Sequence, residues 1–126
     1  MIYGIGTDII SVARVRRALS RFGDKFAQRI LAEREFADFR RRKMPERFLA
    51  KRFAAKEAFS KAMGTGIRAP VTWRYIEVGH DRRGKPLIVP HPLLEARMQE
   101  WGIGGAHISI TDELDTAVAF VILERA

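Results

Sequence analysis

The sequence predicts an α+β fold in which a mainly antiparallel sheet packs against a long buried helix. Helical patterns concentrate in the first half of the chain and strand patterns in the second, a segregation typical of this class. One helical stretch is apolar nearly all round, so the rest of the domain is expected to enclose it. A chain of 126 residues suits one compact domain, which we assign to residues 1–126.

Four elements are predicted in the first half of the chain. β-forming residues with glycines between them indicate an initial strand. Ser11 suits the N-cap of the helix that follows, and Gly23 its end. Pro45 opens the long helix and Gly64 ends it. The elements are the strand Ile2–Ile10 and the helices Val12–Phe22, Glu33–Arg42 and Glu46–Met63.

The second half reads as a hairpin, a helix and two further strands. Asp81–Gly84 is a turn signal between two apolar runs, and Pro92 is suited to start a helix that Gly102 ends. Asp112–Asp115 joins the last two strands. The predicted elements are the strands Tyr75–Val78 and Pro86–Val89, the helix from Pro92 to about Trp101, and the strands His107–Thr111 and Thr116–Leu123.

Composition limits the function classes. The chain has no cysteine, which excludes disulfides and thiolate metal sites. Asp8 interrupts the apolar start and no basic segment precedes it, so we expect no signal peptide, no membrane span and a cytoplasmic location. The formal net charge of +8 favours anionic partners, namely nucleic acid, acidic lipid, phosphorylated ligands or an acidic protein.

Four charged residues stand on the long apolar helix. Arg52 and Lys56 project from the same arc as its phenylalanines, while Glu57 and Lys61 have the spacing of a helix ion pair. Buried charges are costly unless they are paired or bind a metal. An ordinary Glu57–Lys61 salt bridge is one interpretation. A phosphate site that also holds a metal explains both signs of charge at once.

Asp8 and the loop after the long helix extend this pattern. Asp8 lies in an apolar strand, where it either accepts a hydrogen bond from the start of the next helix or binds a hard cation together with Glu57. The loop Gly64-Thr65-Gly66 follows Lys61 closely, and its backbone N–H groups are suited to cradle phosphate. Gly64 is equally suited to a simple helix C-cap.

The strand His107–Thr111 alternates polar and apolar residues. His107, Ser109 and Thr111 therefore share one face, and the isoleucines between them face the core. Such a polar stripe is either a solvated face or a surface that binds a ligand.

Three blocks of the sequence together resemble holo-acyl carrier protein synthases, the short bacterial-type branch of the phosphopantetheinyl transferases. The resemblance covers essentially the whole chain, and the central block is the most specific. The blocks are Ile5-Gly6-Thr7-Asp8-Ile9, Arg52-Phe53-Ala54-Ala55-Lys56-Glu57-Ala58-Phe59-Ser60-Lys61-Ala62 and His107-Ile108-Ser109-Ile110-Thr111.

The resemblance implies an activity and a set of site residues. The activity is transfer of 4'-phosphopantetheine from coenzyme A to a serine of acyl carrier protein, in support of fatty acid biosynthesis. The resemblance also implies a homotrimer with a site at each subunit interface. The sequence departs from the family at Asp112, where many relatives carry a second histidine. The implied residues are Asp8 and Glu57 for Mg²⁺; Asp8, Glu57 and Lys61 for catalysis; and Arg52, Lys61, Gly64, Thr65, Gly66, His107 and Ser109 for coenzyme A.

The first helix supplies a candidate docking surface. Val12, Val15, Leu19 and Phe22 are predicted to form its buried stripe. Another stripe is basic, and the resemblance implies that an acidic carrier protein docks there. Its members are Arg14, Arg17 and Arg21, extended by Lys25.

Two rival functions and the identity of the general base stay open at this level. The run Arg40-Arg41-Arg42-Lys43 favours a nucleic-acid-binding domain, although no recognisable binding motif accompanies it. A non-catalytic module that only binds coenzyme A is the other rival. The base is Glu57 itself, a water held by the metal or, as a weaker candidate, Glu35.

Overall fold

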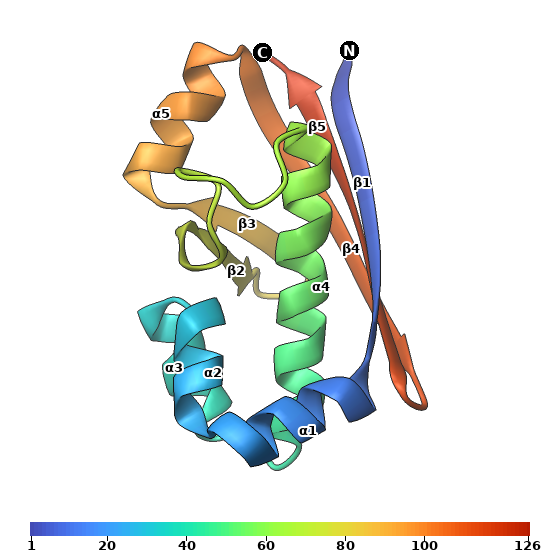
Figure 1. The fold of residues 1–126 in the computed structure, drawn as a ribbon. Coiled ribbons are helices and arrows are strands. Elements are labelled where there is room, and N and C mark those ends of the chain that lie inside the picture. Colours follow the sequence, from blue (N-terminus) through green and yellow to red (C-terminus); the bar gives the residue numbers. More distant parts are fainter.

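The computed structural model describes all residues of the chain and has the expected α+β architecture (Figure 1). A three-stranded antiparallel sheet in the order β1-β5-β4 forms one side, and a two-stranded hairpin, β2-β3, lies across from it. The long helix α4 runs between them, with α1, α2 and α3 at one end of the molecule and α5 at the other (Figure 1). The elements are β1 Ile2–Ser11, α1 Val12–Phe22, α2 Asp24–Ile30, α3 Glu33–Phe39, α4 Pro45–Met63, the 3-10 turn η1 Trp73–Tyr75, β2 Ile76–His80, β3 Pro86–Pro90, α5 Pro92–Glu100, β4 Ile103–Glu113 and β5 Thr116–Arg125.

The interior of the molecule is organised around α4. Its alanines and Phe59 pack against the inner face of the sheet, and its first turns pack against α1 and α2. Two glycines of β1 make this close packing possible. A Cβ atom on Gly6 would collide with the Ala58 carbonyl oxygen, and one on Gly4 with that of Ala62. The absence of a Cβ atom at these two positions therefore lets the strand lie directly against the helix backbone.

Several predicted boundaries are corrected by the structure. The helix predicted over Glu33–Arg42 ends at Phe39, and residues 24–30 form a helix that the sequence analysis did not identify. Gly23, with φ of 66°, separates that helix from α1, so Lys25 belongs to α2 and does not extend the α1 stripe. Phe22 is 57% exposed because it lies at this break, which corrects its assignment to the buried stripe.

The two faces of the sheet differ in what covers them. The inner face carries Ala117, Ala119, Val121 and Leu123 of β5, all buried beneath α4. The outer face has no cover in this chain and keeps several apolar side chains exposed. They include Ile5, Ile9 and Phe120.

Candidate active site between the sheet and α4

Asp8 of β1 and Lys61 of the last turn of α4 form an ion pair. Lys61 Nζ lies 3.2 Å from Asp8 Oδ1 and donates to the Thr7 carbonyl oxygen at 3.0 Å. The interpretation of Glu57 and Lys61 as an ordinary helix salt bridge is therefore wrong. The Asp8 side chain is 18% exposed and that of Lys61 56%, so the lysine is the more accessible partner.

Asp8 does not cap the helix that follows it. Ser11 Oγ accepts the backbone N–H of Arg14 at 3.3 Å, which is the N-cap hydrogen bond of α1. The alternative role of Asp8 as a turn acceptor is thus wrong.

Glu57 is half-buried on the same stretch of α4. Its Oε2 accepts the indole N–H of Trp73 at 3.1 Å, while Oε1 accepts no hydrogen bond from the chain and neither oxygen takes part in an ion pair. Glu57 and Asp8 line one cavity of about 360 Å³ between α1, α2, α4 and β1. The other walls are mostly apolar and include Ile10, Val15, Phe26, Ile30, Leu49 and Phe53.

These two carboxylates fit the needs of magnesium. No group of three or more His, Cys, Asp or Glu side chains that could hold a metal ion gathers anywhere in the structure. Mg²⁺ commonly takes one or two carboxylates and completes its shell with water and substrate phosphate oxygens. Asp8 and Glu57, facing one cavity beside a lysine, supply that kind of donor set.

Arg52 and Lys56, by contrast, belong to a buried ion cluster centred on Glu35. Lys56 Nζ pairs with Glu35 Oε1, and Arg52 Nη1 lies 3.1 Å from Glu35 Oε2. The backbone N–H groups of Ala32 and Val78 also donate to this carboxylate. Burial lowers the pKa of Lys56 to about 8, although the Glu35 charge opposes the shift.

This cluster changes the meaning of two predicted residues. Arg52 has a side chain only 5% exposed and finds its partners within the chain, so its predicted contact with coenzyme A stays a prediction. Glu35 is 2% exposed and does not line the cavity of Asp8 and Glu57. The structure therefore does not bring Glu35 to a position from which it reaches a substrate proton in that cavity.

The loop after α4 closes the helix. Gly64 adopts φ of 82° and its N–H bonds to the Lys61 carbonyl oxygen, so it is a helix C-cap. The N–H of Gly66 bonds to the Ser60 carbonyl oxygen at 3.2 Å, and Thr65 Oγ1 donates to the Gly66 carbonyl oxygen. A phosphate contact by this loop stays a prediction.

His107 and Ser109 lie on the opposite side of the sheet from Asp8. In β4 the buried Ile108 faces α4, whereas His107, Ser109 and Thr111 are exposed on the outer face, as the alternation predicted. The imidazole of His107 pairs there with Glu124 of β5. Asp8, opposite Ala119, faces the interior. One copy of the chain therefore does not place both sets of residues in one site.

The predicted docking residues Arg14, Arg17, Arg21 and Lys25 are all exposed. Arg14 also lines the cavity that contains Asp8 and Glu57. The basic face of α1 is thus continuous with the mouth of the candidate site.

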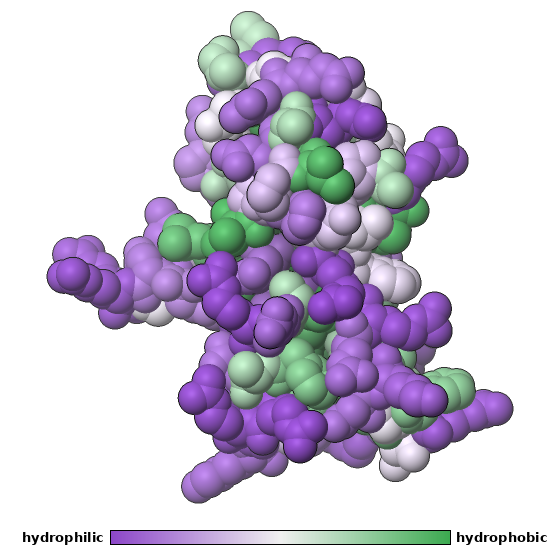
Figure 2. Space-filling model, turned by 90° about the vertical axis from the view of Figure 1, so that its left-hand side faces the viewer, coloured by the Kyte–Doolittle hydropathy of each residue, from purple (hydrophilic) through white to green (hydrophobic).

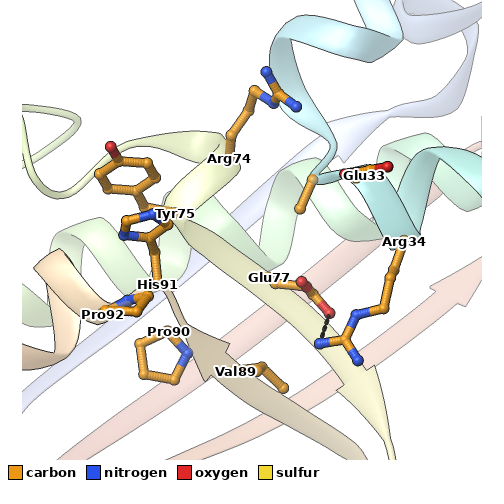
Figure 3. A pocket seen from close by; sticks show the side chains of 10 residues that line it. Glu33, Arg34, Arg74, Tyr75, Glu77, Val89, Pro90, His91 and Pro92 are labelled. Carbon is orange, nitrogen blue, oxygen red and sulfur yellow. Dashed lines mark ion pairs between the residues drawn. The ribbon is translucent and has the colours of Figure 1, made fainter.

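A larger cavity, of about 490 Å³, lies elsewhere, between the start of α3 and the β2-β3 hairpin (Figure 3). Arg34 pairs there with Glu77 at 2.9 Å, and the rings of Tyr75 and His91 stack with centroids 3.8 Å apart. None of the predicted site residues lines this cavity.

The comparison with protein families decides the relationship. Residues 4–119 match the model described as the 4'-phosphopantetheinyl transferase superfamily. The chain belongs to this superfamily. Similar curated proteins include the holo-[acyl-carrier-protein] synthases of Nitrosospira multiformis, 51% identical over 99% of this chain and 100% of the relative, and of Nitrosomonas eutropha, 53% identical with the same coverage.

Solved structures of transferases agree. Holo-[acyl-carrier-protein] synthase from Neisseria meningitidis is 50% identical, superimposes with a TM-score of 0.97 and covers 99% of this chain and 100% of its own. The Helicobacter pylori enzyme, whose structure is a complex with coenzyme A, is 30% identical with a TM-score of 0.84 over 95% of this chain and 99% of its own. The family and fold expected from the sequence are confirmed.

Two features of this transferase chain escaped the sequence analysis. Trp73 was not identified as a neighbour of Glu57, because its hydrogen bond joins residues 16 apart that belong to different elements. The partners of Asp112 were also missed: it pairs with Arg47 at 2.9 Å and with Lys51 at 3.7 Å. The only signal for Trp73 was a large aromatic residue with a polar N–H in an otherwise irregular segment.

Proposed function

We propose that this chain is a holo-[acyl-carrier-protein] synthase, which transfers 4'-phosphopantetheine from coenzyme A to a serine of apo-acyl carrier protein. Membership of the transferase superfamily and identity of about half the residues to enzymes of that name support the assignment. The observation that carries it in the structure is the placement of Asp8 and Glu57 at one cavity that opens beside the basic face of α1, with Lys61 paired to Asp8.

The reaction is a phosphoryl transfer. The serine hydroxyl oxygen forms a bond to the β-phosphorus of coenzyme A, and the bond from that phosphorus to the bridging oxygen breaks. Adenosine 3',5'-bisphosphate leaves with the bridging oxygen and its electron pair. Glu57 Oε1, which has no partner in the chain, accepts the serine proton directly or through one water. Lys61 places a positive charge beside the diphosphate oxygens.

Magnesium is the ion we assign to Asp8 and Glu57. When bound, it supplies positive charge that stabilises the developing charge on the phosphate oxygens. For this to occur Lys61 exchanges its bond to Asp8 for substrate oxygens, and the exposure of its side chain makes that exchange easy.

We further propose that the complete site lies between copies of the chain. If His107 and Ser109 bind coenzyme A, they do so from the outer face of the sheet, whereas Asp8 faces the interior of its own copy. A homotrimer in which the outer face of one copy meets the cavity of the next brings both sets together. The exposed apolar residues of that face support such an interface, since association would bury them.

The opposite side of the molecule differs from this outer face. Figure 2 shows that hydrophilic residues cover most of the side formed by α5, the hairpin, α2 and α3, with only small hydrophobic islands. The sheet is therefore the better candidate for contact between copies. Light scattering should give about three times the 14.4 kDa chain mass.

A mixing experiment tests the shared site directly. Asp8→Ala and His107→Ala proteins should each transfer poorly. After unfolding and refolding together they should regain activity, because each mixed trimer contains one interface with both native residues. A mixture no more active than its two components would overturn the shared site. A stable and fully active monomer would do the same.

The carrier protein is proposed to dock on Arg14, Arg17, Arg21 and Lys25. The apolar cavity beside Arg14 adds room for a side chain of the docked partner. A cytoplasmic location and a role in fatty acid biosynthesis remain predictions. None of the helices combines the length and apolar character needed to cross a bilayer.

Intact-mass spectrometry tests the activity itself. An apo-carrier protein incubated with the chain, coenzyme A and magnesium should gain the mass of phosphopantetheine, and omission of magnesium should prevent the gain. Binding of coenzyme A without any mass gain would favour the non-catalytic module. Salt-dependent binding of DNA, with no response to coenzyme A, would favour the nucleic-acid-binding domain.

A further inference from the structure

Trp73 contacts two consecutive residues of α4, one through its backbone and one through its ring. Its carbonyl oxygen accepts a hydrogen bond from Lys56 Nζ at 2.8 Å. Its indole Nε1 donates to Glu57 Oε2 at 3.1 Å. Two hydrogen bonds therefore join the turn η1 to α4, one at Glu57 and one at Lys56, the residue just before it.

The backbone end of this contact is firmly held. Lys56 is fully buried, and its ammonium group also donates to the Ile30 carbonyl oxygen at 2.7 Å and pairs with Glu35. All three hydrogen atoms of the ammonium group thus have acceptors. Because Lys56 has no freedom to turn, the Trp73 carbonyl is held at a fixed distance from α4.

The ring end is held by packing. The rings of Trp73 and Phe53 lie with centroids 5.8 Å apart and planes inclined by 36°. Phe53 is one turn before Glu57 on α4 and lines the same cavity. Trp73 is thereby held both at its backbone carbonyl and along its ring. This keeps the indole N–H pointed at Glu57.

A neutral donor has a particular advantage beside a carboxylate that must bind a cation. Lys61 orients Asp8 with a full positive charge, which a metal ion has to displace or tolerate. The indole N–H orients Glu57 without a formal charge, so it does not repel a divalent cation. Groups that orient ligating carboxylates in this way usually matter for affinity, at about 10- to 100-fold.

We propose that Trp73 is a positioning residue for Glu57. Its indole N–H holds Oε2 so that Oε1 stays free to bind the metal or to accept the serine proton, and the Glu35–Lys56 pair holds Trp73 in turn. This inference rests on the proposed transferase function. Trp73 acts through Glu57 and is not itself assigned a contact with substrate.

The test compares the two tryptophans of the chain. Trp73→Phe keeps a ring beside Phe53 and removes only the donor and part of the aromatic surface. Trp101→Phe, at the end of α5 beside Arg97, removes an indole from a place remote from Glu57. Mg²⁺ is titrated calorimetrically into each protein saturated with coenzyme A, without carrier protein. Trp73→Phe should bind Mg²⁺ about tenfold more weakly or worse, and Trp101→Phe like the wild type.

Kinetics separate positioning from a general loss of structure. In Trp73→Phe, kcat at sub-saturating magnesium should fall by a factor similar to the loss of Mg²⁺ affinity, and the KM for carrier protein should not change. Magnesium affinity and kcat equal to those of the wild type would overturn the inference, while the proposed function would stand. A wild-type protein that transfers nothing would instead defeat the proposed function.

Fluorescence provides a second measurement that does not need the Trp73 variant to fold. Trp73 is the only tryptophan left in the Trp101→Phe protein. Its emission should change when Mg²⁺ is added in the presence of coenzyme A, and Glu57→Gln in this background should abolish the change. An emission unaffected by magnesium in the active Trp101→Phe protein would contradict a bond between Trp73 and a ligating Glu57.

Discussion

Two glutamates, Glu35 of α3 and Glu57 of α4, have opposite surroundings. Glu35 is 2% exposed and accepts hydrogen bonds from two charged side chains and two backbone N–H groups. Glu57 is half-buried, lines a cavity and accepts one hydrogen bond at its carboxylate, from a neutral indole. Their basic neighbours divide in the same way, since Arg52 and Lys56 are buried whereas Lys61 is largely exposed.

This difference shows how one helix carries charges for two purposes. A carboxylate whose acceptor sites are all used within the fold has no capacity left for a ligand, and its removal leaves buried cations without a partner. A carboxylate with a free oxygen at a cavity is available to a cation or a proton. We therefore expect the Glu35 cluster to matter for stability, and Glu57 with Asp8 and Lys61 to matter for the proposed chemistry.

The largest effect is expected from the carboxylates of the cavity. Asp8→Ala or Glu57→Ala should lower transfer by about 100-fold or more, since such electrostatic contributions are worth roughly 3 kcal/mol. Circular dichroism should show an intact fold, because neither carboxylate belongs to the Glu35 cluster. Near-normal turnover of both variants at sub-saturating magnesium would contradict the assignment.

Substitutions in the buried Glu35 cluster should lower the stability of the fold. Lys56→Met leaves the Glu35 carboxylate with one cation fewer in the interior and should lower the free energy of unfolding by about 3–5 kcal/mol, measured by urea denaturation. Lys51→Met is the matched control on the same helix. Its ammonium group lies 3.7 Å from Asp112 in a more exposed pair, so the cost should stay below about 1 kcal/mol. Equal losses in both variants would show that burial does not set the cost.

Charge reversal on the basic face of α1 should weaken recognition of the carrier protein and leave the chemical step intact. Arg21→Glu should raise the KM for carrier protein without changing that for coenzyme A, and the advantage of the wild type should shrink as salt is added. Arg14→Glu should act in the same direction. Arg97→Glu, on α5 at the far end of the molecule, is the charge-matched control (Figure 1). A rise in the KM for coenzyme A alone would contradict docking on α1.

The smallest effect concerns His80 at the edge of the Glu35 cluster. Partial burial and the nearby Arg52 charge lower its pKa below 6.5. The unfolded chain therefore binds a proton at His80 before the folded protein does, and stability falls as the pH drops below 6.5. His80→Asn should lose part of this acid sensitivity in urea titrations at pH 7 and pH 5. If the free energy of unfolding changes between pH 7 and pH 5 by the same amount in His80→Asn and in the wild type, the prediction is wrong.

The elements that the sequence predicted well are those with local signals. The apolar arc of α4, its Pro45 start and its Gly64 cap lie within one stretch of chain, and Asp8 was identified because a charge stood in an apolar strand. Helix α2 escaped because Gly23 was interpreted only as an end, although it also precedes a new helix with Asp24 in its first turn. A local signal such as Gly23 shows that one helix ends, but it does not show whether a loop or another helix follows.

Local signals could not show which of the four charged residues of α4 belong to the buried cluster and which belong to the candidate site. Periodicity correctly placed Arg52 and Lys56 on the buried arc, but their partner Glu35 comes from another helix, 17 and 21 residues away. The partners of Glu57 and Lys61 are likewise distant, in η1 and β1. Pairings of this kind depend on how the elements pack together, which the spacing of residues along one helix does not specify.

Glu35→Gln and Glu57→Gln, compared side by side, test the central claim most directly, because each change replaces one carboxylate by an amide of the same shape. The measurement is the transfer rate per folded molecule, at a temperature below both unfolding midpoints, together with the free energy of unfolding. We predict that Glu35→Gln loses about 3 kcal/mol of stability and keeps most of its rate. Glu57→Gln should keep its stability and lose about 100-fold or more in rate. A Glu35→Gln protein that is stable but inactive, or a Glu57→Gln protein that is unstable but active, would contradict the account.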